Sequence, residues 1–548
     1  MTRQGADGAV LSSTGPLSAT GLPAATGPLT GLGELARLIL RRDRFLLATW
    51  LVVMALLALG LASGGIAAYP TSADRVALIG EVAANPALLA MRGPVFAPTP
   101  GALAAQGFVT SGVLFNGLVS LLLIIRHTRA DEQAGRRELL GSAVVGRQTP
   151  LAAALAIVGA ANLGVAALVA LSLMVTGLPA GGSAALGLAL AAGGIVFAAV
   201  AAIAAQVAEG AAGARTLALV VLAAALVVAG AGELSGSGLV WWSPFGWARH
   251  LRSFAGEQWW VFALFAGLVA LLTWAAFALS ARRDLGAGLV PARLGPTVAG
   301  ASLRSPIALA WRVHRGAVLG WTVGFALLGA ALGAAMSSIG GLLDTPAYRE
   351  LVATAGDGDV ADAFFRLVLY VLAQIVAASA VASALQVRTQ ETSGLADLLL
   401  SGPVDRIRWA AGHLVLTAAG AALVLTGLGL GAGLGYGRPL EVLGTTLAYL
   451  PACLVFAGIA VALTGWAPRL AAPVTWSVLG LAVALDFLGE FRLADVAVLQ
   501  RISPFAATSV PLTTGSGLAV SVAVLVVIVA GLTGVGLLGL RRRDLDAA

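Results

Sequence analysis

The sequence predicts an all-α integral membrane protein with twelve transmembrane helices, arranged as two parallel six-helix repeats that form a pseudo-dimer. Three observations predict this fold class: a low charge content, a dozen long apolar runs, and landmarks that recur in both halves of the chain. Charged residues make up 11% of the 548 residues and hydrophobic residues 59%, whereas a soluble domain carries about 25% charged residues. The chain cannot cover a water-facing surface, but it can cover one that faces lipid.

The apolar runs are long enough to cross a bilayer, which takes about 20 residues of helix. A stretch rich in Gly, Ser, Thr and Pro comes before them, and we expect residues 1–30 to form a flexible cytoplasmic tail. The two six-helix transmembrane halves are expected over 31–290 and 291–548. The expected spans are 45–68, 104–126, 151–177, 184–207, 213–232, 258–281, 316–340, 364–387, 409–434, 442–465, 470–489 and 517–540.

The basic residues predict the orientation of the chain in the membrane. All 33 are arginines, and with the N-terminus inside, 24 fall in cytoplasmic segments and nine in outer ones. Because cytoplasmic loops carry the excess of Arg and Lys, both termini are expected in the cytoplasm of a multi-pass plasma-membrane protein. Topology therefore explains the net charge of +7, and no nucleic-acid partner is expected. The absence of lysine, with the Ala, Gly and Val content, indicates a GC-rich bacterial genome.

The same landmarks recur in both halves at nearly constant spacing, which is the signature of an internal repeat. Residues 129–147 and 388–406 align without gaps, and the third landmark, S-P-F followed by R-R-D-L, recurs with an offset of 260 residues. The opening spans are preceded by Arg41 and Arg44 in one half and by Arg312 and Arg315 in the other. The aligned pairs after the second span are Arg129 with Arg388, Glu132 with Glu391, Gly135 with Gly394, and Glu138 with Asp397. Since six spans separate the copies, the repeat is parallel.

The repeated segment 129–147 is amphipathic if it is helical, and two interpretations stay open. Its arginines can be simple topology anchors, with the nearby carboxylates balancing their charge. Alternatively, the segment is a docking helix for a soluble motor protein. The second interpretation also explains why Glu132, Gly135 and the acid at 138 or 397 recur at fixed spacing.

The pattern R-x-x-E-x-x-G-x-x-[DE]-L-L, with S-P-F and a closing R-R-D-L in each half, resembles the ABC-2 type exporter permeases, especially the fused twelve-span permeases of tetronasin and polyketide antibiotic export. The resemblance covers the chain from about residue 35 to its end. It implies that the segment after the second span of each half is a coupling helix that contacts an ATPase. Arg129, Glu132, Gly135, Glu138, Arg388, Glu391, Gly394 and Asp397 would form that contact, with Arg41, Arg44, Arg312 and Arg315 in connecting helices.

The resemblance also implies the partners. This chain would be a non-catalytic subunit that binds no cofactor, and two copies of a cytoplasmic ABC ATPase would bind ATP and Mg²⁺. A P-loop needs a lysine to reach the phosphates, and the chain has none, which fits hydrolysis on a separate chain. Arg136 and Arg137 correspond to Leu395 and Ala396, so the two contacts are expected to differ in charge.

The transported substrate is expected to be hydrophobic or amphipathic, such as an antibiotic or other drug, because the predicted spans nearly avoid ionisable groups. Asn116 and Gln374 lie at similar depths and are candidates for the substrate path, although a helix–helix hydrogen bond is the more frequent role of such groups. Two other functions stay open: an ion-coupled secondary transporter, and a non-transporting membrane scaffold or sensor. The lone Cys453 excludes disulfide frameworks and cysteine-cluster metal sites, and no metal site is expected.

Overall fold

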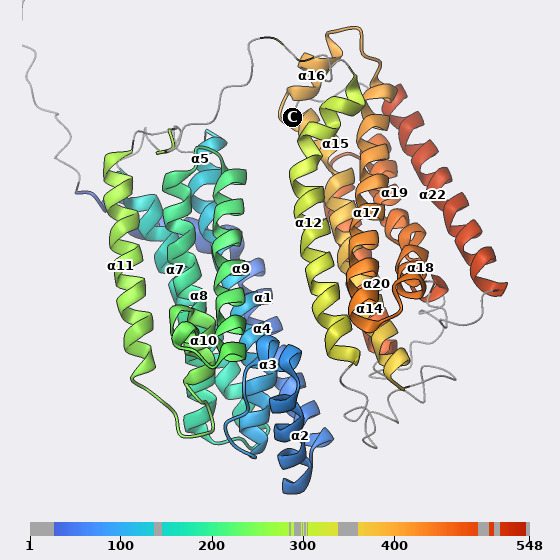
Figure 1. Ribbon diagram of the computed structural model, residues 1–548. Helices are drawn as coiled ribbons and strands as arrows, with labels where there is room; N and C mark the ends of the chain where they lie inside the picture. The colour runs from blue at the N-terminus through green and yellow to red at the C-terminus, as the bar shows by residue number, and fades with distance from the viewer. Residues whose placement is uncertain are drawn as a thin grey trace, which may run out of the picture. The chain divides into compact units, whose positions relative to one another are not determined.

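A computed structural model of the chain describes residues 27–135, 145–283, 287–289, 298, 300, 303, 305–337, 360–490, 503–508 and 516–543. Every regular element in these residues is helical (Figure 1). The chain folds into two compact units. The first comprises 1–59, 109–229 and 241–292, and the second comprises 60–108, 230–240 and 293–548. The predicted boundary at 290/291 stays a prediction.

The first unit is built on long apolar helices, of which α7 packs on α8 and α8 packs on α11. Three of its helices, α1, α4 and α9, extend beyond the limits of the unit. The helices are α1 (Leu32–Ala68), α4 (Pro100–Ile125), the π-helical turn η1 (Arg126–Ala130), α5 (Asp131–Gln133), α7 (Thr149–Val175), α8 (Ala180–Val207), α9 (Ala211–Ser235), α10 (Pro244–His250) and α11 (Val261–Arg282).

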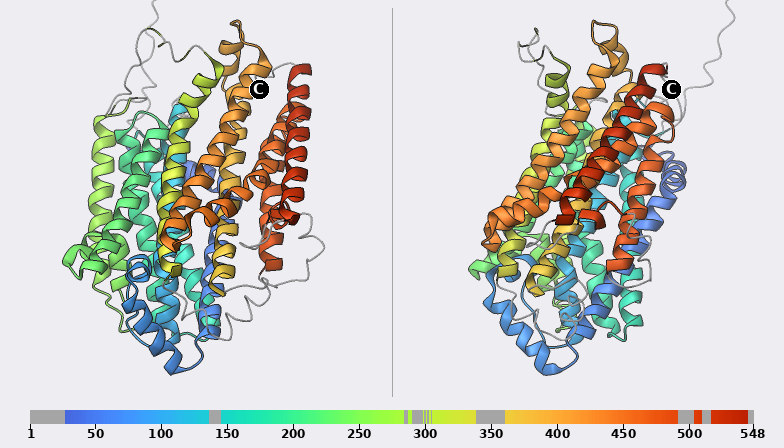
Figure 2. Two further views of the ribbon diagram at one scale, coloured as in Figure 1. Left: turned by 45° about the vertical axis from the view of Figure 1, so that its right-hand side comes forward. Right: turned by 90° about the vertical axis from the view of Figure 1, so that its right-hand side faces the viewer.

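The second unit contains a bundle in which α12, α17, α19 and α22 run side by side (Figure 1), and Figure 2 shows it from two further sides. Its elements are α2 (Ser72–Ala84), α3 (Pro86–Arg92), η2 (Gly238–Trp242, shared with the first unit), α12 (Pro306–Ser337), α14 (Val360–Ala384), α15 (Gln386–Thr392), α16 (Leu395–Leu400), α17 (Arg406–Tyr436), α18 (Pro439–Ala448), α19 (Leu450–Trp466), α20 (Ala471–Glu490), η5 (Ala506–Thr508) and α22 (Ser516–Arg542).

Helices α12 and α17 approach each other at their backbones. Three glycines of α17, spaced four residues apart, face three carbonyl oxygens of α12, also spaced four residues apart. A methyl group on any of these glycines would lie under 3.0 Å from the facing oxygen. Small residues at such spacing let helices pack closely in lipid, where no hydrophobic force pulls them together. The glycines are Gly427, Gly431 and Gly435, and the carbonyl oxygens belong to Thr322, Ala326 and Ala330.

Eleven helices in the described ranges are long and apolar enough to cross a membrane, which fits the predicted all-α membrane fold. The predicted span over 470–489 overlaps α20, whose apolar stretch Ala471–Asp486 is shorter than the roughly 20 residues that a span needs. Twelve spans in two repeats therefore stay a prediction. The segments before the first and seventh predicted spans are not separate helices, because α1 and α12 run without a break from Leu32 and Pro306.

Candidate functional site

The segment that follows α4 ends on a glycine turn, and so does its counterpart α15, which follows α14. Gly135 has φ +70° and Gly394 has φ +72°, in the left-handed region. Only glycine adopts this conformation without a steric penalty, and it is the usual way to end a helix. The recurrence of glycine at this place in both halves therefore has a backbone cause.

In the first half, the glutamate that precedes this turn is bound by an arginine from the end of the last helix. Arg283, directly after α11, donates from one Nη atom to both carboxylate oxygens of Glu132, at 3.0 and 2.7 Å. Arg129 contacts the same carboxylate at 3.2 Å. All three side chains are at most 7% exposed. The Arg147 guanidinium donates to the carbonyl of Arg283, which fixes the backbone there.

The second half has the same set of contacts. Arg543, directly after α22, donates to both carboxylate oxygens of Glu391 at 2.7 Å. Arg388 contacts that carboxylate at 3.1 Å. Arg406 donates to the carbonyl of Arg543 at 2.8 Å, as Arg147 does to that of Arg283. We call each of these clusters a Glu–Arg latch: Arg129, Glu132, Arg147 and Arg283 in the first half, and Arg388, Glu391, Arg406 and Arg543 in the second.

Each latch ties the segment after one span to the end of the last helix of the same half. A carboxylate held by two guanidinium groups forms charge-assisted hydrogen bonds, which are shorter and stronger than neutral ones. Removing one partner of such a buried pair costs about 3–5 kcal/mol, because the other charge is left without compensation. Glu132 and Glu391 are thus held by the chain's own arginines, and their predicted role in docking an ATPase stays a prediction.

Arg283 and Arg543 are functional candidates that the sequence did not single out. They belong to the repeated R-R-D-L motif, which served only to align the two halves. The signal was the recurrence itself, because a charged motif repeated in so apolar a chain needs a partner of opposite charge.

The surroundings of the two latches differ. In the first half, α1 is joined to the segment after α4 by charges. Asp43 accepts from Arg126 at 2.9 Å and contacts His127 at 2.6 Å, and Arg42 pairs with Asp131 at 3.0 Å. Asp43 and His127 are both buried, so this cluster excludes water at its centre.

In the second half, neutral groups occupy the corresponding region. His314 of α12 contacts His413 of α17 at 2.9 Å and the Ser383 hydroxyl at 3.0 Å. His413 in turn contacts the side-chain oxygen of Gln390 at 3.1 Å. That oxygen also accepts from the indole N–H of Trp409. We call this set the histidine network.

The remaining residues predicted to contact an ATPase are placed as follows. Asp397 is exposed on α16, whereas Glu138 lies outside the described residues. The four arginines expected in connecting helices lie on α1 and α12 with exposed side chains, where they can meet a partner or lipid headgroups. They are Arg41, Arg44, Arg312 and Arg315.

The two candidates for the substrate path are buried and hydrogen-bonded within their own units. Asn116 donates to the Asn162 side chain at 2.7 Å and to the carbonyl of Leu190 at 2.8 Å. Gln374 donates to Asp486 at 3.1 Å. Both contacts are helix–helix hydrogen bonds, the frequent role of such groups in membranes, and substrate contact stays a prediction.

Comparison with known proteins places the chain in a family. The chain is 39% identical over 533 residues to the multidrug efflux system permease protein Rv1217c of Mycobacterium tuberculosis, and the alignment covers 94% of this chain and 95% of that protein. The family described as the C-terminal domain of the multidrug efflux system permease Rv1217c matches residues 303–541. The chain belongs to this family of permeases. The matched C-terminal range contains the histidine network and all of the second latch except Arg543, and the near-complete alignment extends over the first half as well.

Proposed function

We propose that the chain is the membrane permease of an ATP-driven ABC exporter that moves hydrophobic or amphipathic small molecules, such as drugs, out of the cell. The observation that carries this proposal is the 39% identity, over nearly the full length, to a multidrug efflux system permease. The apolar helices long enough to cross a membrane support it. The fused ABC-2 architecture, with two parallel six-helix repeats and both termini in the cytoplasm of a GC-rich bacterium, belongs to the same proposal.

The energy source is proposed to be ATP hydrolysed by two copies of a separate cytoplasmic ATPase, which bind ATP and Mg²⁺. Support comes from the absence of lysine, which excludes an ordinary P-loop in this chain. The presence of one latch in each half supports two docking places. We propose that Glu132 and Glu391 act by holding the docking segments against the last helices through Arg283 and Arg543, while the exposed Asp397 and the arginines of α1 and α12 contact the ATPase.

Transport can be measured in inside-out membrane vesicles that contain the chain and a Walker-type ATPase purified with it. We expect ATP-dependent uptake of a neutral hydrophobic dye such as Nile red, and no uptake when the P-loop lysine of the ATPase is replaced by alanine. Uptake driven by a pH gradient without the ATPase would contradict the proposal and indicate a secondary transporter. Absence of transport under both conditions, with the complex intact, would indicate a scaffold or sensor.

A charge swap separates a positioning role of the glutamate from direct docking. Glu391→Ala removes the latch, and we expect it to weaken ATPase stimulation by the chain about tenfold or more. The triple variant Glu391→Arg with Arg543→Glu and Arg388→Ala restores a pair of opposite charges in reversed order and removes the arginine that would otherwise repel the new one. If the glutamate positions the segment, the swap recovers much of the stimulation. If it contacts the ATPase directly, the swap is as defective as the single variant.

A further inference from the structure

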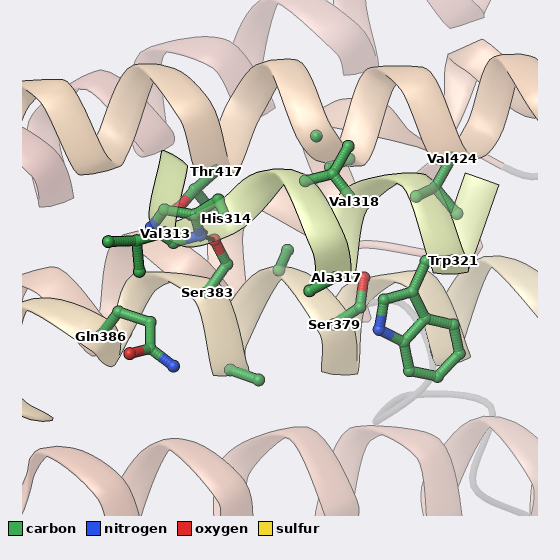
Figure 3. A pocket seen from close by; sticks show the side chains of 14 residues that line it. Val313, His314, Ala317, Val318, Trp321, Ser379, Ser383, Gln386, Thr417 and Val424 are labelled. Carbon is green, nitrogen blue, oxygen red and sulfur yellow. Dashed lines mark hydrogen bonds between the residues drawn. The ribbon is translucent and has the colours of Figure 1, made fainter. Parts of the chain in front are cut away.

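A pocket in the second half lies between α12, α14 and α17 and has a volume of about 140 Å³. Figure 3 shows His314, Ser383 and Thr417 gathered at one side of it, with Trp321 at the other and Ala317 and Ser379 between them. None of the 14 residues that line it is an acid or an arginine. A polar wall and an apolar remainder are typical of small-molecule sites, in which a few polar groups set the orientation of the ligand.

The second copy of the repeat carries smaller side chains than the first at three positions of the pocket wall. With the offset of 259 residues that aligns the latches, three residues lining the pocket on α14 correspond to larger residues of α4. The larger residues are all buried in the first half. Replacing a buried leucine or isoleucine by a smaller residue leaves a cavity wherever the neighbours do not collapse. The pairs are Leu121 with Ala380, Leu123 with Ala382, and Ile124 with Ser383.

The second copy also lacks charge at this place. When Arg41 and Arg44 of α1 are aligned with Arg312 and Arg315 of α12, Arg42 corresponds to Val313 and Asp43 to His314. His127 corresponds to Gln386. A neutral ligand that entered the charged cluster of the first copy would have to separate its ion pairs, which is costly, whereas a wall of neutral groups avoids that cost. The second copy therefore has smaller side chains and an uncharged wall, the two features that a neutral ligand needs.

The histidine network fixes which hydrogen-bonding groups face the pocket. The indole N–H of Trp409 can only donate, so the Gln390 side-chain atom that it contacts is the oxygen. His413 Nε2 contacts the same oxygen and therefore carries the proton. His413 Nδ1 then accepts from His314 Nε2, and His314 Nδ1 accepts from the Ser383 hydroxyl. The proton of Thr417 is donated to the carbonyl of His413. The Ser383 and Thr417 hydroxyls are hydrogen-bonded to each other at 2.9 Å, and the lone pairs that remain on their oxygens can accept from a donor in the pocket.

We propose that this pocket binds a neutral aromatic small molecule that carries one N–H or O–H donor. Its volume is close to that of an engineered apolar cavity of about 150 Å³ that binds benzene. The Trp321 ring and the valines provide the apolar contact, and Ser383 and Thr417 accept the hydrogen bond. Binding does not depend on ATP; only the step from this site to an exported substrate rests on the proposed function.

The test uses a thiol reporter in the purified full-length chain. Ser379→Cys places a thiol in the pocket wall, and the only native cysteine, Cys453, is buried, so labelling by a small methanethiosulfonate reports on the pocket. The probes are indole, which has an N–H donor, and benzofuran, which has the same shape with an oxygen in its place. We expect indole to slow labelling at a concentration roughly tenfold lower than benzofuran does, because one neutral hydrogen bond distinguishes them.

Restoring the side chain of the first copy should fill the pocket. Ala382→Leu does so at an exposed position of α14 that lines it, and we expect loss of protection by both probes. Ala419→Leu adds the same group at an exposed position of α17 outside the pocket and should leave protection unchanged. If Ala382→Leu lowers expression, Ser383→Ile provides a second variant that fills the pocket and removes an acceptor.

Equal protection by indole and benzofuran would show that the ligand does not need an N–H or O–H donor, and would overturn that part of the proposal. Absence of protection by both, for example because a lipid chain fills the pocket, would overturn the ligand site itself. These outcomes are obtained without an ATPase, so they are distinct from a failure of ATP-driven export in vesicles. If the permease exports but neither probe protects the thiol from labelling, the proposed function stands and the proposed ligand site is wrong.

Discussion

In the first half, α1 is held to the segment after α4 by ions, with Asp43 between Arg126 and His127. In the second half, α12 is held by the neutral contacts of His314 with His413 and Ser383. The latch beside each of these clusters is the same: a glutamate held by the arginine that follows the last helix.

This difference indicates which contacts are interchangeable. A buried carboxylate needs a compensating charge, so neither half can lose one latch residue without a large cost. The cluster next to it can change from charged to neutral, provided that all its members change together. The second half has the neutral cluster, and the pocket lies beside it.

The largest expected effect comes from breaking a latch. Glu132→Ala and Glu391→Ala should each lower the free energy of unfolding by about 3–5 kcal/mol, since each leaves two guanidinium groups uncompensated, which are buried in the first half and half-buried in the second. Glu441→Ala is the matched control, because the Arg438–Glu441 pair is exposed and long at 3.8 Å and should contribute under about 1 kcal/mol. Chemical unfolding in detergent measures these differences. A large loss in only one half would show that the latches are not equivalent.

Asp43→Asn tests the charged cluster of the first half. The buried carboxylate accepts from two cationic or potentially cationic partners, and the amide can accept but cannot neutralise them, so we expect a loss of about 2 kcal/mol in unfolding free energy. The same unfolding measurement applies. A neutral result would mean that Asp43 is dispensable, and the contrast between the halves would then lie in volume alone.

His314→Leu tests the neutral cluster at the corresponding position. It removes hydrogen bonds to His413 and Ser383, and we expect a loss of about 1 kcal/mol per neutral hydrogen bond. Unlike the loss of an exposed ion pair, this loss should not change between low and high salt. A clear dependence on salt would show that the histidine network carries charge.

Much of this arrangement could be predicted from the sequence, because hydropathy and recurrence are local signals. The long helices and the recurrence of Glu132 with Glu391 and of Gly135 with Gly394 follow from hydropathy and spacing alone. The partners Arg283 and Arg543 could not be derived, since each lies about 150 residues from its glutamate. The continuity of α1 through its arginines could not be derived either, because a run of charges suggests the end of a helix, whereas here the arginines are exposed on one and Asp43 is buried between them.

The smallest expected effect comes from the partly exposed pair of Arg42 with Asp131, whose side chains are 35% and 16% exposed. Arg42→Val places the residue of the second copy in α1, where Val313 stands in α12. We expect a loss of about 0.5 kcal/mol in unfolding free energy, which disappears at about 1 M salt because exposed ion pairs are screened. A loss as large as that of Asp43→Asn would show that α1 is held mainly by this outer pair and not by the buried carboxylate. The distinction decides whether the charged cluster of the first half is centred on its buried acid, as the second half's network is centred on its buried histidines.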